Sequence, residues 1–188
     1  MAIDNIRDWI KVLEEADELV RVSAEVDPYL EISEIVDRVS KEQGAENKAL
    51  LFENVKGSSM PVFVNGFGSA KRMALSLGVD DIEEHAKRIR DLLDQAPPES
   101  LLEKLKILPT LLEVGKWMPK QVKSAPCQEV VLEGDDIDLS KIPVLTTWPE
   151  DAGPFITYPL CVTRDPESGR RNLGTYRLQV MSSNTTGF

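Results

Sequence analysis

The spacing of apolar residues changes once along this chain, and that change constrains the fold more than any other feature of the sequence. In the first part, runs with the spacing of amphipathic helices alternate with short strand-like runs. From Cys127 onward the runs are strand-like and are separated by turn-forming residues. Residues 115–126, GKWMPKQVKSAP, lie between the two patterns and have two prolines and no clear period. We therefore expect an α+β protein with an N-terminal α/β domain at residues 1–118 and the first part of a β domain at residues 119–188.

The N-terminal part contains the signals of several capped helices. Asn5, or the aspartate before it, precedes a helical pattern of apolar residues that runs to Leu13. Asp27 is followed by Pro28, which favours a helix that begins there and ends at Gly44. Further helices are predicted over residues 69–79 and 80–95 and from residue 101, and strands over residues 18–26, 49–55 and 60–68. This order of elements is typical of an α/β unit.

The C-terminal part has the pattern of a β-hairpin. The segment DPESG, residues 165–169, consists of turn formers and lies between two strand-like runs. We expect residues 155–163 and 171–181 to pair antiparallel around it. The segment CQEVVLEG, residues 127–134, is a further strand-like run. We expect no third strand in the remaining residues, SSNTTGF, so the β domain begins here without being completed.

Composition excludes several classes of protein. A net charge of −10 repels a polyanion at long range, so the chain is not expected to bind nucleic acid. No apolar run approaches the roughly 20 residues that cross a bilayer, and the N-terminus lacks the apolar region of a signal peptide. Cys127 and Cys161 lie far apart without metal-site spacing, which favours two free thiols. We expect a cytoplasmic protein without an integral membrane segment.

Cationic and amide side chains cluster in the segment RRNLGTYRLQV, residues 170–180. Arg170, Arg171, Asn172 and Arg177 occur within eight residues of a strand-like run that does not need them for its core. In an acidic chain, a local cluster of this kind is needed to hold an anionic ligand. The alternative is an edge strand whose arginines are solvated after the turn.

Several segments together resemble one family, the UbiD-type decarboxylases, also known as the 3-octaprenyl-4-hydroxybenzoate carboxy-lyase family. These segments are ELVRVSAEVDPYLEISEIVDR, ALLFENVKGSSMPV, FGSAKRMALSLGV, APCQEVVLEGDDIDLSKIPVLTTWPEDAGPFIT and RNLGTYRLQV. The resemblance covers essentially the whole chain. It implies an N-terminal α/β domain, a split β-barrel that binds prenylated flavin mononucleotide (FMN), and a C-terminal domain used in dimerisation. Enzymes of this family are well over twice as long, so we expect the chain to be the front part of a homo-oligomeric enzyme.

The resemblance also implies an activity. Members of the family decarboxylate, and sometimes carboxylate, aromatic or α,β-unsaturated acids. The motifs are most similar to those of the branch that decarboxylates 4-hydroxy-3-polyprenylbenzoate in ubiquinone biosynthesis. An enzyme with such a substrate is expected in the cytoplasm, and at the membrane surface where the substrate is polyprenylated.

The resemblance assigns roles to four residues. Asn172 matches a ligand, through its side-chain oxygen, of the Mn²⁺ or Mg²⁺ that bridges to the cofactor phosphate, and hard cations prefer oxygen donors. Thr175, Tyr176 and Arg177 match the stretch that contacts the flavin. Arg177 also matches the catalytic arginine, whose guanidinium holds the substrate carboxylate. Regular strand alternation would place Asn172 and Arg177 on opposite faces, so we expect a bulge or bend at Gly174.

Other residues that the resemblance implies are absent from this chain. In the family, a histidine and a glutamate complete the metal site, and acid/base glutamates follow them. Without these residues the chain alone is not expected to turn over substrate, so it is part of a longer enzyme or a subunit completed by another chain. Two further classes stay open. One is a non-catalytic interaction or regulatory module derived from the decarboxylase front end, and the other is a flavin-reductase-like barrel that binds unmodified flavin.

Three remaining features have ordinary explanations. The segment GFGSAKRMALSLG weakly suggests a phosphate loop, but it lacks the P-loop spacing and is explained by a glycine turn before a capped helix. In LTTWPEDAGPFIT we expect Trp148 to be packed and Glu150 and Asp151 to be solvated. His85, the only histidine, is expected to be a partly exposed helix residue rather than a metal ligand.

Overall fold

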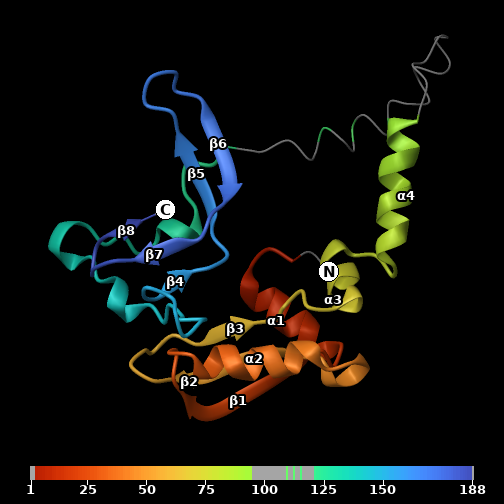
Figure 1. Ribbon diagram of the computed structural model, residues 1–188. Helices are drawn as coiled ribbons and strands as arrows, with labels where there is room; N and C mark the ends of the chain where they lie inside the picture. The colour runs from red at the N-terminus through yellow and green to blue at the C-terminus, as the bar shows by residue number, and fades with distance from the viewer. Residues whose placement is uncertain (1–2, 95–108, 110–111, 113–114, 116–120, 188) are drawn as a thin grey trace. The chain divides into compact units, whose positions relative to one another are not determined.

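The computed structural model describes residues 3–94 and 121–187 and the single positions 109, 112 and 115 (Figure 1). Two compact units are present, one made of Met1–Ile82 with Gly134–Phe188 and the other of Glu83–Glu133. The mixture of helices and small sheets confirms the α+β class. The helix predicted from residue 101 and the domain boundary predicted between residues 118 and 119 fall on positions outside the described residues, so both stay predictions.

Elements of the N-terminal part follow the predicted order. The helices are α1 (Ile6–Glu15), α2 (Glu31–Lys41), α3 (Ala70–Leu77) and α4 (Ile82–Leu93), and the short 3-10 helices are η1 (Gly44–Glu46), η2 (Pro126–Gln128), η3 (Gly134–Asp136) and η4 (Leu139–Lys141). The strands are β1 (Leu19–Val26), β2 (Ala49–Val55), β3 (Val62–Val64), β4 (Phe155–Ile156), β5 (Leu160–Arg164), β6 (Arg171–Thr175), β7 (Leu178–Val180) and β8 (Thr186–Gly187).

Helix α1 begins where the sequence predicts. The side-chain oxygen of Asn5 accepts hydrogen bonds from the N–H groups of Arg7 and Asp8 at 2.9 and 3.1 Å, so it satisfies two of the donors that a helix start leaves open. Trp9 and Leu13 are one turn apart and both are buried. One face of α1 therefore packs against the sheet.

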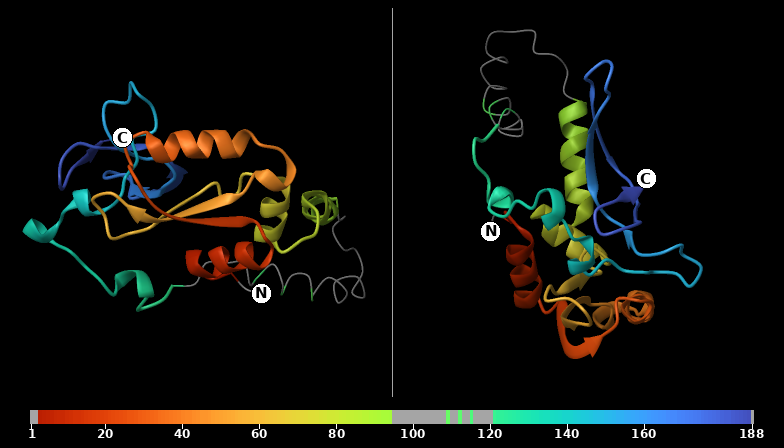
Figure 2. Two further views of the ribbon diagram at one scale, coloured as in Figure 1. Left: turned by 90° about the horizontal axis from the view of Figure 1, so that it is seen from below. Right: turned by 90° about the vertical axis from the view of Figure 1, so that its left-hand side faces the viewer.

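A three-stranded sheet with the order β1-β2-β3 lies at the centre of the N-terminal part. β1 and β2 are parallel and are connected through α2, whereas β3 pairs antiparallel with β2. Side chains alternate along β2: Leu50 and Phe52 pack with Ile32 of α2, while Ala49 packs with Trp9 of α1. The two helices cover opposite faces of the sheet (Figure 2). β2 is thus covered on both faces, which explains why its first four residues are all buried.

The predicted N-cap of α2 is wrong. The helix begins at Glu31, and the carboxylate of Asp27 instead accepts a hydrogen bond from the N–H of Tyr29 at 2.9 Å. Leu30 has a φ of 65°, outside the helical region. Its N–H donates to the carbonyl of Thr146 at 3.0 Å, and the N–H of Thr146 donates back into the same turn at 3.2 Å. This backbone exchange fixes the turn before α2, and its distant partner left no local signal in the sequence.

The glycine turn before α3 is structural, as predicted. Ser69 caps the helix, because its hydroxyl oxygen accepts a hydrogen bond from the N–H of Arg72 at 3.2 Å. A Cβ atom at Gly68 would lie 1.8 Å from the side-chain oxygen of Asn65. Glycine is therefore required by close packing of the turn, without any need for a phosphate ligand.

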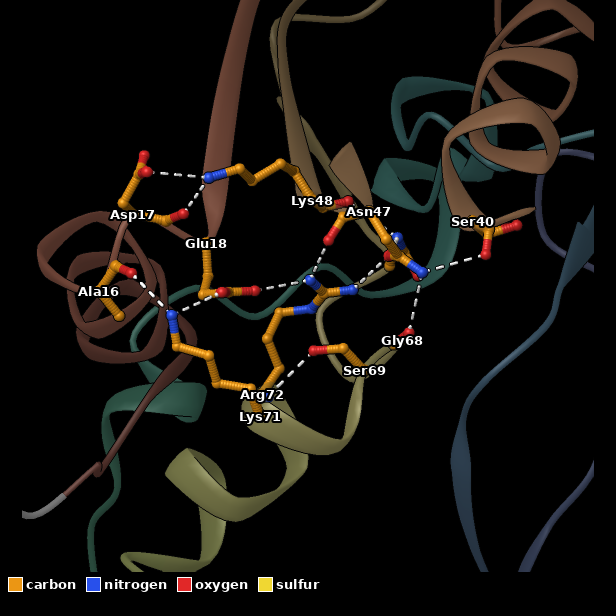
Figure 3. Close-up of polar contacts among 11 residues, drawn as sticks. Ala16, Asp17, Glu18, Ser40, Asn47, Lys48, Gly68, Ser69, Lys71 and Arg72 are labelled. Atoms are coloured by element: carbon orange, nitrogen blue, oxygen red, sulfur yellow. Dashed lines mark hydrogen bonds and ion pairs between the residues drawn. The ribbon is translucent and has the colours of Figure 1, made fainter. Parts of the chain in front are cut away.

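Both cations that follow this turn are used inside the protein. Arg72 is fully buried, and its guanidinium donates to the Glu18 carboxylate at 2.9 Å and to the backbone and side-chain oxygens of Asn47 at 2.6 and 2.7 Å (Figure 3). Lys71 pairs with Glu18 at 2.8 Å and donates to the carbonyl of Ala16 at 3.3 Å. Burial alone would raise the pKa of Glu18, but the hydrogen bonds from Lys71 and Arg72 outweigh it and lower that pKa. The basic pair thus joins α3 to the start of β1.

The predicted hairpin is confirmed. β5 pairs antiparallel with β6, and β4 pairs antiparallel with β7. The carboxylate of Asp165 closes the loop by accepting hydrogen bonds from the N–H groups of Glu167 and Ser168, both at 2.8 Å. The two predicted arms therefore form two successive pairings, which belong to separate sheets.

Two expectations for the C-terminal part are wrong. A third strand does follow the hairpin, since β8 pairs with β7 and gives a sheet with the order β4-β7-β8. The segment 127–134 is not a strand: η2 occupies its start, and Val130 and Val131 are 78% and 65% exposed. High β-propensity forms a strand only where a partner strand is available. The sheets among the described residues stay small and open, without a closed barrel.

Candidate functional site

The segment 170–180 changes from one sheet to another in its middle. β6 ends at Thr175 and β7 begins at Leu178. The pairing of β6 is regular through Gly174, which lies opposite Cys161. The bulge or bend predicted at Gly174 is therefore absent, and the strand instead ends at Thr175. As a result, Asn172 and the residue at position 177 are not on one strand.

Asn172 lies on β6 and is held by a tyrosine of the same segment. Its side-chain N–H₂ donates to the phenolic oxygen of Tyr176 at 3.0 Å. The Tyr176 ring folds back over Gly174, where an added Cβ atom would lie 2.6 Å from the ring. Because the amide uses its nitrogen in this bond, its oxygen points away from the tyrosine. Thr175 is exposed at the end of β6, and the two arginines that begin the segment are exposed as the solvated alternative predicts.

Arg177 is the most tightly held member of the predicted site. Its Nη1 donates to Asp151 Oδ1 at 3.1 Å, and its Nη2 donates to Asp151 Oδ2 at 2.6 Å and to the Thr147 hydroxyl at 2.8 Å. The guanidinium carbon lies 3.9 Å from the centre of the Phe155 ring, within the range of a cation–π contact. The plane and the direction of the guanidinium are therefore both fixed.

Asp151 is held as firmly as its partner. Its Oδ2 also accepts hydrogen bonds from the Thr147 hydroxyl at 3.0 Å and from the N–H of Trp148 at 3.2 Å. The hydrogen bonds from Arg177 lower the pKa of the Asp151 carboxyl, against the opposing effect of burial. The pair is charged at neutral pH as a consequence.

An open cavity of about 1320 Å³ lies beside this ion pair. Residues of α2 line one side, and Thr147, Trp148 and Arg177 line the other. Asp151 is not one of the lining residues. Arg177 thus faces the cavity, whereas its carboxylate partner lies behind it.

The described residues can be compared with the metal site that the resemblance implies. No group of three histidine, cysteine, aspartate or glutamate side chains that could hold an ion is found among them. Asn172 is exposed and offers one oxygen donor of the kind that suits Mn²⁺ or Mg²⁺, since its bond to Tyr176 uses the amide nitrogen. The residues present therefore fit one ligand of such an ion.

Two residues of this site were assigned wrongly from the sequence. Asp151 was expected to be solvated, but its side chain is 11% exposed and paired, whereas Glu150 is exposed as expected. Trp148 was expected to be packed, but it is 65% exposed beside the cavity. A carboxylate that follows a Trp-Pro turn is a signal for a local turn hydrogen bond, but nothing local indicates its pairing with Arg177.

Two expectations about the rest of the chain are met by the described residues. His85 is partly exposed on α4, and both cysteines are free thiols. Within the ranges that the structure covers, no helix has the length and apolar character needed to cross a membrane.

Comparison with known families identifies the class of protein. The model of the 3-octaprenyl-4-hydroxybenzoate carboxy-lyase N-terminal domain matches residues 10–93, and the model of the Rift-related domain of the same carboxy-lyase matches residues 120–188. The chain belongs to this family, the UbiD-type carboxy-lyases.

Solved structures of UbiD-class enzymes are similar over almost the whole chain. HmfF from Pelotomaculum thermopropionicum in complex with FMN has a TM-score of 0.71 and 30% identity, covering 96% of this chain and 35% of its own. An evolved dimeric form of HmfF in complex with prFMN gives 0.70 and 30%, with coverage of 94% and 36%. Vanillic acid decarboxylase from Sedimentibacter hydroxybenzoicus in closed form gives 0.75 and 29%, with coverage of 100% and 37%. The chain thus spans little more than a third of the length of these enzymes.

Proposed function

We propose that this chain is the N-terminal part of a prenylated-FMN-dependent decarboxylase that acts on an aromatic acid. Membership of the UbiD-type family and the similarity to HmfF with its bound prFMN support the cofactor. Similarity to a vanillic acid decarboxylase supports an aromatic substrate. In this proposal, residues 1–118 form the α/β domain and residues 119–188 begin the flavin-binding domain of a cytoplasmic homo-oligomer.

The placement of Arg177 at the wall of the cavity carries the proposal. A guanidinium has five N–H donors, and Asp151 and Thr147 accept from three of them. Among the described residues, the other two N–H donors of Arg177 have no acceptor. They are available to a ligand. A substrate carboxylate would accept a charge-assisted hydrogen bond there, and the exposed Trp148 ring offers an aromatic surface beside it.

Asn172, Thr175 and Tyr176 would face the cofactor. Asn172 would contribute its side-chain oxygen to Mn²⁺ or Mg²⁺, which suits a hard cation next to a phosphate. A bound prenylated flavin would supply the electron sink for loss of CO₂, and the protein supplies orientation and charge. In the longer protein, Asn172→Ala should lower the metal content and the retention of the cofactor. Metal content equal to that of the wild type would remove Asn172 from this role.

The experiment that tests the proposal uses the full-length protein purified with its cofactor. We expect the released flavin to have the mass of prenylated FMN, and the holoenzyme to release CO₂ from an aromatic acid. Arg177→Ala should lower this rate by at least about 100-fold while the flavin stays bound. Release of unmodified FMN would favour a flavin-reductase-like protein. Absence of both flavin and CO₂ release would favour a non-catalytic module.

The substrate requires a comparison of its own. We propose 4-hydroxy-3-polyprenylbenzoate, because the motifs are most similar to those of the ubiquinone branch. A short-chain 3-prenyl-4-hydroxybenzoate and vanillate, supplied separately to the holoenzyme, distinguish this assignment from other phenolic acids. Turnover of vanillate alone would overturn the ubiquinone assignment and leave the decarboxylase class intact.

A further inference from the structure

We infer that Asp151 and Thr147 are positioning residues that aim the Arg177 guanidinium into the cavity. This inference rests on the proposed function, in which Arg177 binds the substrate carboxylate. Three features of the structure support the inference. They are the occupied edge of the guanidinium, the position of the Asp151 carboxylate, and the groups that hold this carboxylate.

Three of the five N–H groups of the Arg177 guanidinium are occupied. Asp151 uses both of its oxygens on the two terminal nitrogens of Arg177, at 3.1 and 2.6 Å. Thr147 takes the remaining N–H of Nη2 at 2.8 Å. Two-point contact of this kind fixes a guanidinium in orientation as well as in position, which a single contact does not. The Nε–H and one N–H of Nη1 then point in directions set by the protein.

The position of the Asp151 carboxylate indicates that it orients Arg177 and does not itself contact a ligand. The side chain of Asp151 is 11% exposed and that of Arg177 is 38% exposed. Arg177 and Thr147 line the cavity, but Asp151 does not. A ligand in the cavity would therefore contact Arg177 without contacting Asp151. The carboxylate acts on such a ligand through the arginine.

The Asp151 carboxylate is itself held by hydrogen bonds, so its own position is fixed. The N–H of Trp148 and the hydroxyl of Thr147 donate to Asp151 Oδ2 at 3.2 and 3.0 Å. The N–H of Asp151 donates to the carbonyl of Trp148 at 3.1 Å, which closes the turn. The guanidinium carbon also lies 3.9 Å from the centre of the Phe155 ring. A long and otherwise flexible arginine side chain is thereby restricted before any ligand arrives, and loss of alignment at a reacting group lowers rates strongly.

The test uses the full-length holoenzyme and four substitutions. Asp151→Asn removes one acceptor and the charge, and Thr147→Val removes the hydroxyl at similar volume. Both should lower kcat/KM for the aromatic acid by about 10- to 100-fold. Thr147→Ser keeps the hydroxyl and should recover most of the loss seen with valine. Glu150→Gln is the matched control, because this neighbouring carboxylate is exposed, and its kcat/KM should equal that of the wild type.

The flavin absorbance separates positioning from a structural role, since it should stay at the wild-type value in all four variants. The thermal midpoints of Thr147→Ser and Glu150→Gln should also stay at the wild-type value. An unchanged kcat/KM in Asp151→Asn would overturn the inference. A Thr147→Ser variant as impaired as Thr147→Val would also overturn it, and this pair decides the question even where Asp151→Asn fails to fold. Wild-type activity in Arg177→Ala would instead remove Arg177 from substrate binding, and absence of CO₂ release from the wild-type holoenzyme would overturn the proposed function. Loss of activity in Arg177→Ala with normal activity in Asp151→Asn would overturn the positioning role alone.

Discussion

At the scale of single residues, Arg72 shows how a charge is accommodated in the interior. Its side chain has no exposed surface, and its partners Glu18 and Asn47 supply three oxygen acceptors. A buried ion pair of this kind adds little stability compared with apolar packing, but removal of one partner leaves an uncompensated charge. The contribution of Arg72 is therefore measured by what its loss does to Glu18.

Substitution of Arg72 should be much more destabilising than substitution of its neighbour. Arg72→Ala leaves the Glu18 carboxylate without its buried partner and should lower the free energy of unfolding by about 3–5 kcal/mol. Lys71→Ala is the matched control, because the Lys71 side chain is 59% exposed and its pair with Glu18 should contribute about 1 kcal/mol or less. Urea denaturation of both variants measures the difference. Equal losses would contradict this account of the buried pair.

The Asp151–Arg177 pair should make stability depend on pH in the acidic range. The pKa of Asp151 is lowered in the folded protein, so the pair stabilises the fold above the unfolded value of about 3.9 and loses this effect as the pH falls through the lower folded value. The difference in urea midpoint between wild type and Asp151→Asn should therefore be constant from pH 7 to about 5 and shrink below about 4. A difference that grows on acidification would contradict the sign of this shift.

Local interactions decided which residues could be assigned from the sequence. The caps Asn5 and Ser69 were predicted correctly because their hydrogen-bond partners lie two or three residues away. The roles of Asp151 and Leu30 were missed because Arg177 and Thr146, which fix them, are distant in sequence. The resemblance identified Asn172 and Arg177 as candidate site residues, but it did not indicate how each is held.

At the scale of elements, β6 and the tyrosine that follows it hold the Asn172 side chain in place. The Tyr176 ring can fold over Gly174 because this position has no side chain, and the ring then holds the Asn172 amide at 3.0 Å. The bend expected at Gly174 is absent, and Tyr176 and Arg177 form the connection between β6 and β7. The glycine thus serves close packing within β6, whereas the strand break places Arg177 in the connection between β6 and β7.

Loss of the contact between Tyr176 and Asn172 should weaken the proposed metal site. In the full-length protein, Gly174→Ala should displace the Tyr176 ring, and Tyr176→Phe should remove the acceptor of the Asn172 N–H₂. Each change should lower metal affinity by about 10- to 100-fold, as is usual when a partner that orients a ligand is lost. Metal titration of the purified protein measures this. Tyr158→Phe, at an 80% exposed tyrosine, is the control, and an effect as large as that of Tyr176→Phe would contradict the assignment.

The spacing of apolar residues predicted the helices better than it predicted single strands. Helix α4 was predicted from its apolar stripe, yet Ile89 and Leu93 of that stripe are 49% and 79% exposed. The pattern therefore identified the element without identifying what it packs against. Residues 127–134 had the composition of a strand and formed none, because strand formation depends on a partner that composition does not reveal.

At the scale of the whole molecule, the apolar core is concentrated in the N-terminal part. Among the described residues, the buried apolar side chains are Trp9, Leu13, Val26, Ile32, Ala49, Leu50, Leu51, Phe52, Val55, Val62 and Ala74. In the described part of the β segment, the one buried side chain is polar, that of Thr146. The predicted α/β unit therefore contains its own core, and Leu145 of the β segment packs against the edge of that core.

This distribution predicts that the two predicted domains behave differently when they are produced separately. Residues 1–118 contain both apolar clusters and should unfold cooperatively on heating. Residues 119–188 contain small open sheets without a buried apolar cluster among the described residues, and small sheets without such a core are marginally stable at best. Circular dichroism melts and amide NMR dispersion of the two fragments measure this. A dispersed spectrum from residues 119–188 alone would mean that the β segment is stabilised by its own strand pairing, so that the N-terminal core is not needed to hold the cavity wall at Arg177.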